Sequence, residues 1–546
     1  MVRKLIKNGS TLFASRQQTI LGAAFILASM VALSRILGLV RTRLLAQYFP
    51  PAEIAVYFAA FRVPDFLYNV FVYGALSVAF IPVFSSLLSK KGTKEAFSFS
   101  SNLLTLGVVF YTLFSVIVFI FAEPIVRLVV IGFEGVEFAE TVMLTRVLLF
   151  AQLFFVAGGM FSSILQVNRY FLVPALAGVL YNMGIIFGIL MFSQRYHIWA
   201  PVIGVYIGAA LYLAVHFPLL RKVGFVYKPL LSLRDKGLVE VVRLMLPRML
   251  ATLAEQVRMT FNMSLASVIS TRSVTFFSIS HQLFLVPIGL FASSVAQAAL
   301  PVFSDEYSKG DIKSFARTFT VSLQQMLFFI LPSAAILVVL KIPVVRLVFG
   351  ADQFNWEATV LTSLTVAWLS VGLAFESANM LFIRAFYALH DTFTPVKVIL
   401  FALVADALFA LFFITYLKWD VWSLGIAATI GGAITSLFLY VLLSKRVSGI
   451  MSKEFFVPLF KMSICALAMA VSLYLPIKAL DQVVVDTTRT VGLIVLTGIA
   501  GTCGMLIYVF FTWVLRVKEA FMIVEYARKF LDKGEKVASE ISVQSS

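Results

Sequence analysis

Long apolar blocks separated by short polar segments dominate this chain. Fourteen such blocks lie at residues 19–41, 54–87, 98–122, 139–165, 172–193, 200–220, 246–270, 274–302, 318–343, 358–388, 396–417, 420–444, 456–478 and 489–515. Each has the length of about 20 residues or more that a helix needs to cross roughly 30 Å of hydrocarbon. The alternation typical of membrane β-strands is absent. The pattern predicts an all-α polytopic membrane protein with about fourteen transmembrane helices.

Three of these blocks, the second, eighth and tenth, are longer than one crossing requires. Their length predicts tilt, a kink at Pro64 or Pro287, or extension beyond the bilayer.

The composition agrees with a membrane protein. The chain is 61% hydrophobic and 13% charged, about half the charged fraction of soluble domains. Its net charge of +17 lies in short segments between the apolar blocks and not on one basic face. We therefore expect contact with anionic membrane lipids, and no nucleic-acid binding.

The segments between blocks alternate in charge. Basic residues concentrate at 90–94, 221–243, 309–317 and 445–453, and acidic residues lie in the intervening segments on the opposite side. The positive-inside rule then predicts that the N-terminus and the C-terminus are both cytoplasmic. The basic start of the chain leads into an uncleaved first helix, with a signal peptide as the alternative.

An internal repeat suggests the domain organisation. The sequence Pro-Val-Phe-Ser occurs at 82–85 and again at 301–304, 219 residues later, each time before a basic segment with a Gly and a Phe. Chance recurrence is the alternative. An offset of six helices predicts a parallel repeat of two lobes around a central cavity, with alternating access between them. The predicted parts are a basic N-terminus (1–18), an N-lobe (19–222), a cytoplasmic linker (223–245), a C-lobe (246–444), two further helices (445–516) and an amphipathic tail (517–546).

Charged residues inside the first two blocks are the candidate substrate-binding residues, namely Arg35, Arg41, Arg62 and Asp65. Charges within spans are costly, so they indicate a water-filled cavity, a partner or a site. A guanidinium group matches phosphate oxygens in a bidentate fork, which favours an anionic cargo. As alternatives, Arg41 could extend to the membrane interface, and Arg62 could pair with Asp65 three residues later.

Other ionisable residues also lie within the apolar blocks. Asp406 has no cation nearby in the sequence and is a candidate for coupling to H⁺ or Na⁺, with a partner from another helix as the alternative. Glu255 and Arg258 are three apart and are expected to pair. The ring nitrogens of His216 are expected to find hydrogen-bond partners on a neighbouring helix.

Signals of enzymatic chemistry are missing. We find no P-loop, no Gly-x-Ser-x-Gly turn, no Asp-x-Asp pair in a loop, and no metal-ligand spacing around the two cysteines. The sequence therefore predicts a protein that is not an enzyme, with no catalytic residue, no metal and no cofactor.

Several segments resemble one known family. Residues 34–41 (Ser-Arg-Ile-Leu-Gly-Leu-Val-Arg) are similar to the Ser-Arg-x-x-Gly-x-x-Arg opening of MurJ/MviN proteins. Residues 58–64 and 74–83 resemble their second helix, and Pro247 with Gln256 and Asn262 resembles their seventh. Residues 385–396 resemble the segment that joins their tenth and eleventh helices. The resemblance extends from about residue 20 to residue 515.

This resemblance implies the MOP exporter superfamily architecture and movement of lipid II from the cytoplasmic to the outer leaflet of a bacterial inner membrane. The arginines would bind the diphosphate headgroup, and the last two helices would hold the lipid tail. The driving force would be H⁺, Na⁺ or the membrane potential. Cell-wall synthesis proteins are the expected partners.

Four positions depart from the family's charge pattern, where this chain has Ala55, Tyr68, Tyr73 and Gln282. The expected substrate is accordingly lipid II, or another polyprenyl-linked oligosaccharide or a drug exported by a member of the same superfamily. A membrane scaffold that transports nothing is the third alternative.

Overall fold

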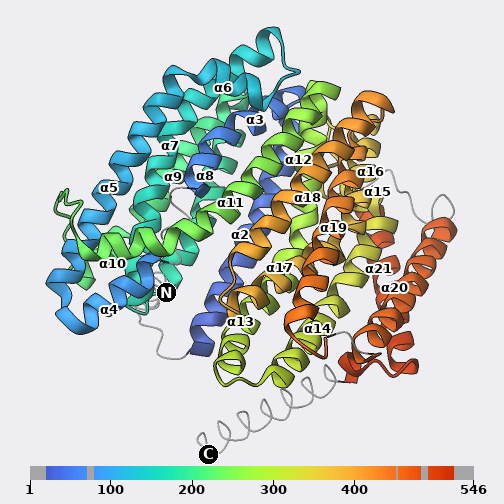
Figure 1. Ribbon diagram of the computed structural model, residues 1–546. Helices are drawn as coiled ribbons and strands as arrows, with labels where there is room; N and C mark the ends of the chain where they lie inside the picture. Colours follow the sequence, from blue (N-terminus) through green and yellow to red (C-terminus); the bar gives the residue numbers. More distant parts are fainter. Residues whose placement is uncertain (1–19, 71–78, 451–452, 481–489, 522–546) are drawn as a thin grey trace, which may run out of the picture. The chain divides into compact units, whose positions relative to one another are not determined.

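All regular elements of the described part of the chain are helical (Figure 1). The computed structural model describes residues 20–70, 79–450, 453–480 and 490–521. Within these ranges no strand occurs, which confirms the predicted all-α class. The predicted basic N-terminus, Tyr73 and most of the predicted amphipathic tail lie outside the described residues.

The chain forms two compact units, residues 1–279 with 348–359 and residues 280–347 with 360–546. The helices that lie wholly in the first unit are α2 (Ile20–Tyr48), α3 (Pro51–Tyr68), α4 (Ile81–Lys91), α5 (Thr93–Ile120), α6 (Ala122–Val129), α7 (Gly135–Val167), α8 (Leu172–Tyr196), α9 (Trp199–Ala214), α10 (Phe217–Val223) and α11 (Lys236–Ile269).

Helix α12 (Thr271–Pro287) crosses from the first unit to the second. The later elements are η3 (Ile288–Ala292), α13 (Ser293–Ser308), α14 (Ile312–Val339), α15 (Lys341–Phe349), α16 (Trp356–Val371), α17 (Leu373–Ala388), α18 (Phe393–Leu411), η4 (Phe412–Tyr416), α19 (Trp422–Arg446), α20 (Lys453–Leu480) and α21 (Thr490–Val514). The division into two six-helix lobes and two extra helices stays a prediction, because contacts in one conformation do not report which helices move together.

Ten helices of the described residues are long and apolar enough to cross a membrane, and eleven if α16 and α17 form one span bent by 44°. These helices make the chain a multi-pass membrane protein. The figure of about fourteen spans stays a prediction, since parts of the predicted blocks lie outside the described residues.

The long predicted blocks are interrupted in the structure. After Pro287 the chain passes through the π-helical turn η3 before it continues as α13. Proline cannot donate a backbone hydrogen bond, and π-turns commonly absorb such a break. The tenth block breaks at Gly372, between α16 and α17. Pro64 lies inside α3, which continues to Tyr68.

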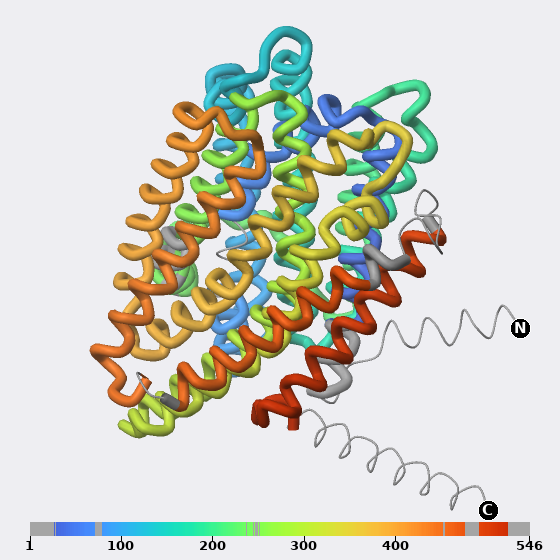
Figure 2. Tube along the Cα trace, turned by 90° about the vertical axis from the view of Figure 1, so that its right-hand side faces the viewer, coloured from blue at the N-terminus to red at the C-terminus, as the bar shows by residue number. Residues whose placement is uncertain are grey.

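Helices α20 and α21 lie side by side in the second unit (Figure 2). They bury Met462, Cys465, Met469 and Tyr508 in one apolar cluster with Phe328 of α14. The Tyr508 hydroxyl donates a 2.9 Å hydrogen bond to the Phe328 carbonyl oxygen. Cys465 is therefore a small buried packing residue.

Helices α8 and α9 of the first unit pack backbone against backbone. A Cβ atom added at Gly184 would lie 2.3 Å from the Gly208 Cα atom, and one added at Gly188 would lie 2.5 Å from the Gly204 Cα atom. Between helices in lipid the hydrophobic effect contributes little, so association depends on such close packing of small residues. This glycine contact fixes α9 against α8, which carries part of the candidate site.

We predict that Gly184→Ala lowers the free energy of unfolding by about 1–3 kcal/mol, because the new methyl group meets backbone atoms that cannot move independently. Thermal unfolding of the purified protein in detergent measures the effect. Gly498→Ala in α21 is the control, since nothing lies within 4 Å of its added Cβ atom. Equal midpoints for the two variants would contradict the packing argument.

Candidate functional site

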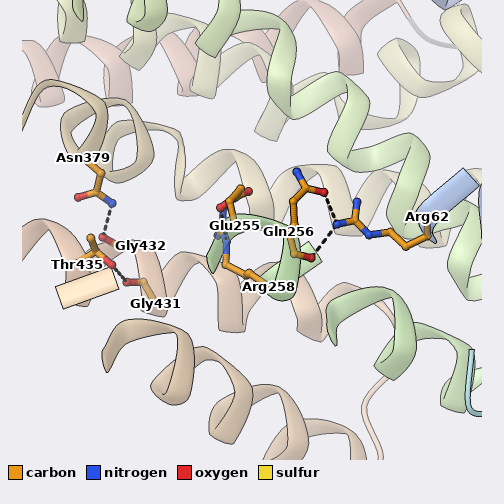
Figure 3. Close-up of polar contacts among 8 residues, drawn as sticks. All are labelled: Arg62, Glu255, Gln256, Arg258, Asn379, Gly431, Gly432 and Thr435. Atoms are coloured by element: carbon orange, nitrogen blue, oxygen red, sulfur yellow. Dashed lines mark hydrogen bonds and ion pairs between the residues drawn. The ribbon is translucent and has the colours of Figure 1, made fainter. Parts of the chain in front are cut away.

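The guanidinium group of Arg62 in α3 is bound by α11 (Figure 3). Its Nη2 atom donates to the carbonyl oxygen of Gln256 at 2.7 Å and to the side-chain oxygen of Gln256 at 2.6 Å. Its Nε atom donates to the Thr260 hydroxyl oxygen at 2.8 Å. All three acceptors are neutral, so the positive charge is fixed in position but is not cancelled at contact distance.

Asp65 lies one turn later in α3 and bonds to a different helix. Its Oδ1 atom accepts a 2.8 Å hydrogen bond from the side-chain amide of Gln152 in α7. No ion pair joins Asp65 to Arg62 among the described residues. The alternative of an Arg62–Asp65 structural pair is therefore not found in this structure, although the two charges are close enough to interact electrostatically.

Arg41 of α2 bonds to α8. Its Nη1 atom donates to the side-chain oxygen of Asn182 in α8 at 3.2 Å. The Asn182 amide in turn donates to the backbone oxygen of Ser34 at 3.2 Å and to the carbonyl oxygen of Gly178 at 3.1 Å. The Nε atom of Arg41 is buried and has no hydrogen-bond partner in the described part of the chain.

The structure brings Arg41, Arg62 and Asp65 into one electrostatic neighbourhood. Asp65 lies within electrostatic range of both arginines. Two positive charges and one negative charge thus share a region of low dielectric constant, where electrostatic interactions are stronger than in water. The arrangement can hold an anionic group.

The remaining candidate of the first unit, Arg35, lies six residues before Arg41 in α2. It is partly buried and makes interactions with its surroundings. Of the departures from the family pattern, Ala55 is fully buried in α3, and Tyr68 packs edge-on against Phe155 with ring centroids 6.3 Å apart. Those two positions are therefore occupied by packing residues.

Asp406 belongs to the second unit and lies in α18. It is 2% exposed and makes interactions of its own. A Cβ atom added at Gly431 of α19 would lie 3.1 Å from the Asp406 Cβ atom. The Thr435 hydroxyl donates to the Gly431 carbonyl oxygen at 2.9 Å. The Asp406 side chain is thus buried beside the consecutive glycines Gly431 and Gly432 of α19.

A second carboxylate, that of Glu376, lies near the same pair of glycines in α19. The added Cβ atom of Gly432 would lie 3.7 Å from the Cγ atom of Glu376 in α17. The side-chain amide of Asn379 donates to the Gly432 carbonyl oxygen at 3.1 Å (Figure 3). Three helices of the second unit therefore place polar groups around Gly431 and Gly432.

Two predictions about pairing are confirmed. Arg258 and Glu255 form an ion pair with an N–O distance of 3.0 Å (Figure 3). His216 is fully buried, with Nε2 2.7 Å from the Ser162 hydroxyl and Nδ1 2.8 Å from the Tyr212 carbonyl oxygen. A carbonyl oxygen only accepts, so Nδ1 carries the proton and Nε2 accepts from Ser162. His216 is satisfied within the protein.

The residues that orient the charges, namely Gln152, Asn182 and Thr260, are not among the site residues that the sequence predicts. Each is an uncharged polar residue within an apolar block, and a polar side chain within a predicted span is the sequence signal for such a residue. Gln256 was noticed only through the family resemblance. Among the described residues no group of three or more His, Cys, Asp or Glu side chains could hold a metal ion.

The chain is similar to proteins of a known family. The family described as lipid II flippase MurJ matches residues 45–496. A probable lipid II flippase MurJ from Buchnera aphidicola subsp. Baizongia pistaciae is 26% identical over 445 residues, which cover 80% of this chain and 85% of the relative. The lipid II flippase MurJ from Burkholderia cenocepacia is 26% identical over 438 residues, which cover 78% of this chain and 84% of the relative.

Solved structures show the same similarity. A lipid II flippase MurJ in an inward closed conformation matches with a TM-score of 0.73 and 26% identity, over 90% of this chain and 98% of that protein. An inward-facing multidrug resistance MATE transporter of the MOP superfamily matches with a TM-score of 0.68 and 16% identity, over 78% of this chain and 98% of the transporter. The second match shows a shared fold alone.

We predict that Gln152→Leu lowers the free energy of unfolding by about 1–3 kcal/mol, because it leaves the partly buried Asp65 without its hydrogen-bond donor. Thermal unfolding measures the loss. The control is Gln297→Leu, since Gln297 is exposed and its replacement should stay within about 0.5 kcal/mol. A loss no larger than that of the control would mean that Gln152 does not support Asp65.

Proposed function

The chain belongs to the lipid II flippase MurJ family, and we propose that it moves a lipid-linked diphosphate glycan of the lipid II type across a bacterial cytoplasmic membrane by alternating access. A charged headgroup cannot enter hydrocarbon without losing its hydration. Transport therefore requires a polar interior that opens to one side at a time. The charges around α2 and α3 supply such an interior in the first unit.

The observation that supports this proposal most directly is that the Arg62 guanidinium is hydrogen-bonded to neutral acceptors. Its three hydrogen bonds use Nε and Nη2 and go to neutral oxygens. The two N–H groups of Nη1 make no hydrogen bond to the described residues. A guanidinium that is already oriented loses little freedom when it binds a phosphate oxygen pair. Arg62 is therefore assigned to the diphosphate.

The neighbouring charges complete the proposed site. Arg41 supplies a second cation. Arg35, six residues earlier in α2, supplies a third. Asp65 reduces the net positive charge of the cluster, which favours release of the anion once the protein has changed conformation. Binding that is too tight would slow transport, because affinity differences are expressed mainly in the rate of dissociation.

Asp406 is proposed to couple transport to H⁺ or Na⁺. A buried carboxylate is costly when ionised, so it favours the uptake of a proton or a small cation. The backbone of α19 at Gly431 lies close to its side chain. The membrane potential acting on the substrate charge is the alternative driving force.

We also propose an orientation for the chain in the membrane. The basic segments are assigned to the cytoplasm, which places both termini there, and anionic lipids are expected to contact them. Cell-wall synthesis proteins are the proposed partners. Another polyprenyl-linked oligosaccharide or a drug is the alternative cargo, and a scaffold without transport is the third possibility. Competition by each cargo class against labelled lipid II in vesicles distinguishes them.

We predict that Arg62→Ala slows translocation of fluorescent lipid II in proteoliposomes at least about tenfold, which corresponds to ~1.4 kcal/mol of lost transition-state stabilisation. Arg62→Lys should also be slower than the parent, because an ammonium group cannot reproduce the planar fork.

The control for this experiment is Arg272→Ala, since Arg272 is 47% exposed and pairs with the exposed Glu357. It should transport at the parental rate. A folded Arg62→Ala protein that flips lipid II as fast as this control would remove Arg62 from the site.

We predict that Asp406→Asn abolishes the response of translocation to an imposed H⁺ or Na⁺ gradient, because an amide cannot take up a proton or balance a cation. The measurement is the initial rate of lipid II translocation with and without each gradient. Asp305→Asn, at an exposed ion pair with Lys309, should respond as the parent does. An unchanged response in the Asp406 variant would exclude it as the coupling residue.

A further inference from the structure

The turn between α6 and α7 approaches α11 at backbone distance. The Gly132 amide donates a 3.1 Å hydrogen bond to the Ser267 hydroxyl oxygen. That hydroxyl donates to the Ser264 carbonyl oxygen at 2.6 Å. A Cβ atom added at Gly132 would lie 2.0 Å from the Ser267 carbonyl oxygen and 2.9 Å from the Val268 Cα atom. Only glycine fits this position while the contact is closed.

The turn that carries Gly132 is held rigidly. Phe133 is fully buried, and its carbonyl oxygen accepts a 2.8 Å hydrogen bond from Arg127 Nη1. The Arg127 guanidinium carbon also lies 3.6 Å from the ring centroid of Phe138 in α7. The turn therefore presents Gly132 to α11 in a fixed conformation and cannot relieve a clash by moving alone.

A second contact joins the same two parts of the chain. The Thr275 hydroxyl near the start of α12 donates a 2.6 Å hydrogen bond to the Pro51 carbonyl oxygen at the start of α3. Thr275 is fully buried, and Ser267 is 1% exposed. Helices α3, α6 and α7 lie in the predicted N-lobe, whereas α12 and the part of α11 that carries Ser267 lie in the predicted C-lobe. Both contacts are thus made between segments that alternating access must separate.

We propose that Gly132 and Ser267 form the latch of an outer gate, which closes by direct contact between the α6–α7 turn and the end of α11. The inference relies on the proposed function for alternating access and for the side that this end faces. A single neutral hydrogen bond contributes little net stability, so the latch can open. Because Gly132 has no side chain, the α6–α7 turn can approach the backbone of α11 to hydrogen-bonding distance.

The closed latch requires glycine at position 132. A methyl group there cannot be accommodated by a side-chain rotation, because the atoms that it meets belong to the backbone of α11. The closed state alone is penalised, since the open state has no such contact. A change that acts on one of two states shifts their populations. Gly132→Ala should therefore favour the open gate.

The experiment measures gate opening without using the substrate. In a Cys465→Ala, Cys503→Ala background, Ser264→Cys is the reporter, because Ser264 is 5% exposed and takes part in the latch only through its carbonyl oxygen. A membrane-impermeant maleimide is applied from outside, and the labelling rate is followed. Val136→Cys is the topology control, since Val136 is 70% exposed next to the turn.

We expect Gly132→Ala to raise the labelling rate of the reporter by about tenfold, within the range of typical conformational coupling. Ser267→Ala, which removes the hydrogen-bond acceptor without adding atoms, should raise it roughly fivefold. Gly107→Ala in α5 should leave the rate unchanged, because its added Cβ atom meets only the Val156 side chain, at 3.7 Å. Val136→Cys should label in every variant.

Unchanged reporter labelling in Ser267→Ala and in a folded Gly132→Ala overturns the latch, and so does an equal rise in Gly107→Ala. If Gly132→Ala does not fold, Ser267→Ala decides alone. Failure of Val136→Cys to label from outside would place this end in the cytoplasm and overturn an outer gate. These outcomes are independent of lipid II translocation, which is scored separately and tests the proposed function.

Discussion

The constraint that organises the first unit is the cost of charge in a membrane. A guanidinium or carboxylate group surrounded by hydrocarbon is unfavourable by several kcal/mol, and this structure meets that cost with neutral polar partners from other helices. Arg62 is held by α11, Asp65 by Gln152 of α7, and Arg41 by Asn182 of α8. These contacts connect helices that are far apart in the sequence, and they hold the charged groups with neutral partners.

Glycine contacts serve two purposes in the same unit. Between α8 and α9 they allow backbones to touch along the helices, and this contact has no reason to open. At Gly132 a turn touches α11 at one point, supported by one hydrogen bond. We therefore assign the contact along α8 and α9 to the scaffold and the contact at Gly132 to the proposed gate.

Resemblance at the level of motifs does not separate structural residues from substrate residues. Asp391 lies in the segment that resembles the family between the tenth and eleventh helices. Its carboxylate accepts from the Thr394 amide at 2.9 Å and the Thr394 hydroxyl at 2.6 Å, and it pairs with Arg446 at 2.5 Å. Burial opposes ionisation, but these hydrogen bonds and Arg446 together lower the pKa of Asp391. This motif residue therefore caps α18 and joins it to α19.

The sequence by itself determined the all-helical membrane class, because the length of an apolar block and its lack of alternation depend only on neighbouring residues. It also identified Arg35, Arg41, Arg62 and Asp65 as unusual, since charge in an apolar block is visible without a fold. Only the tertiary structure decided their partners. Arg62 and Asp65 are three residues apart, yet each bonds to a different helix, because hydrogen-bond geometry depends on how helices pack and not on spacing along one helix. The requirement for glycine at position 132 was likewise invisible, since it arises from a backbone 135 residues away.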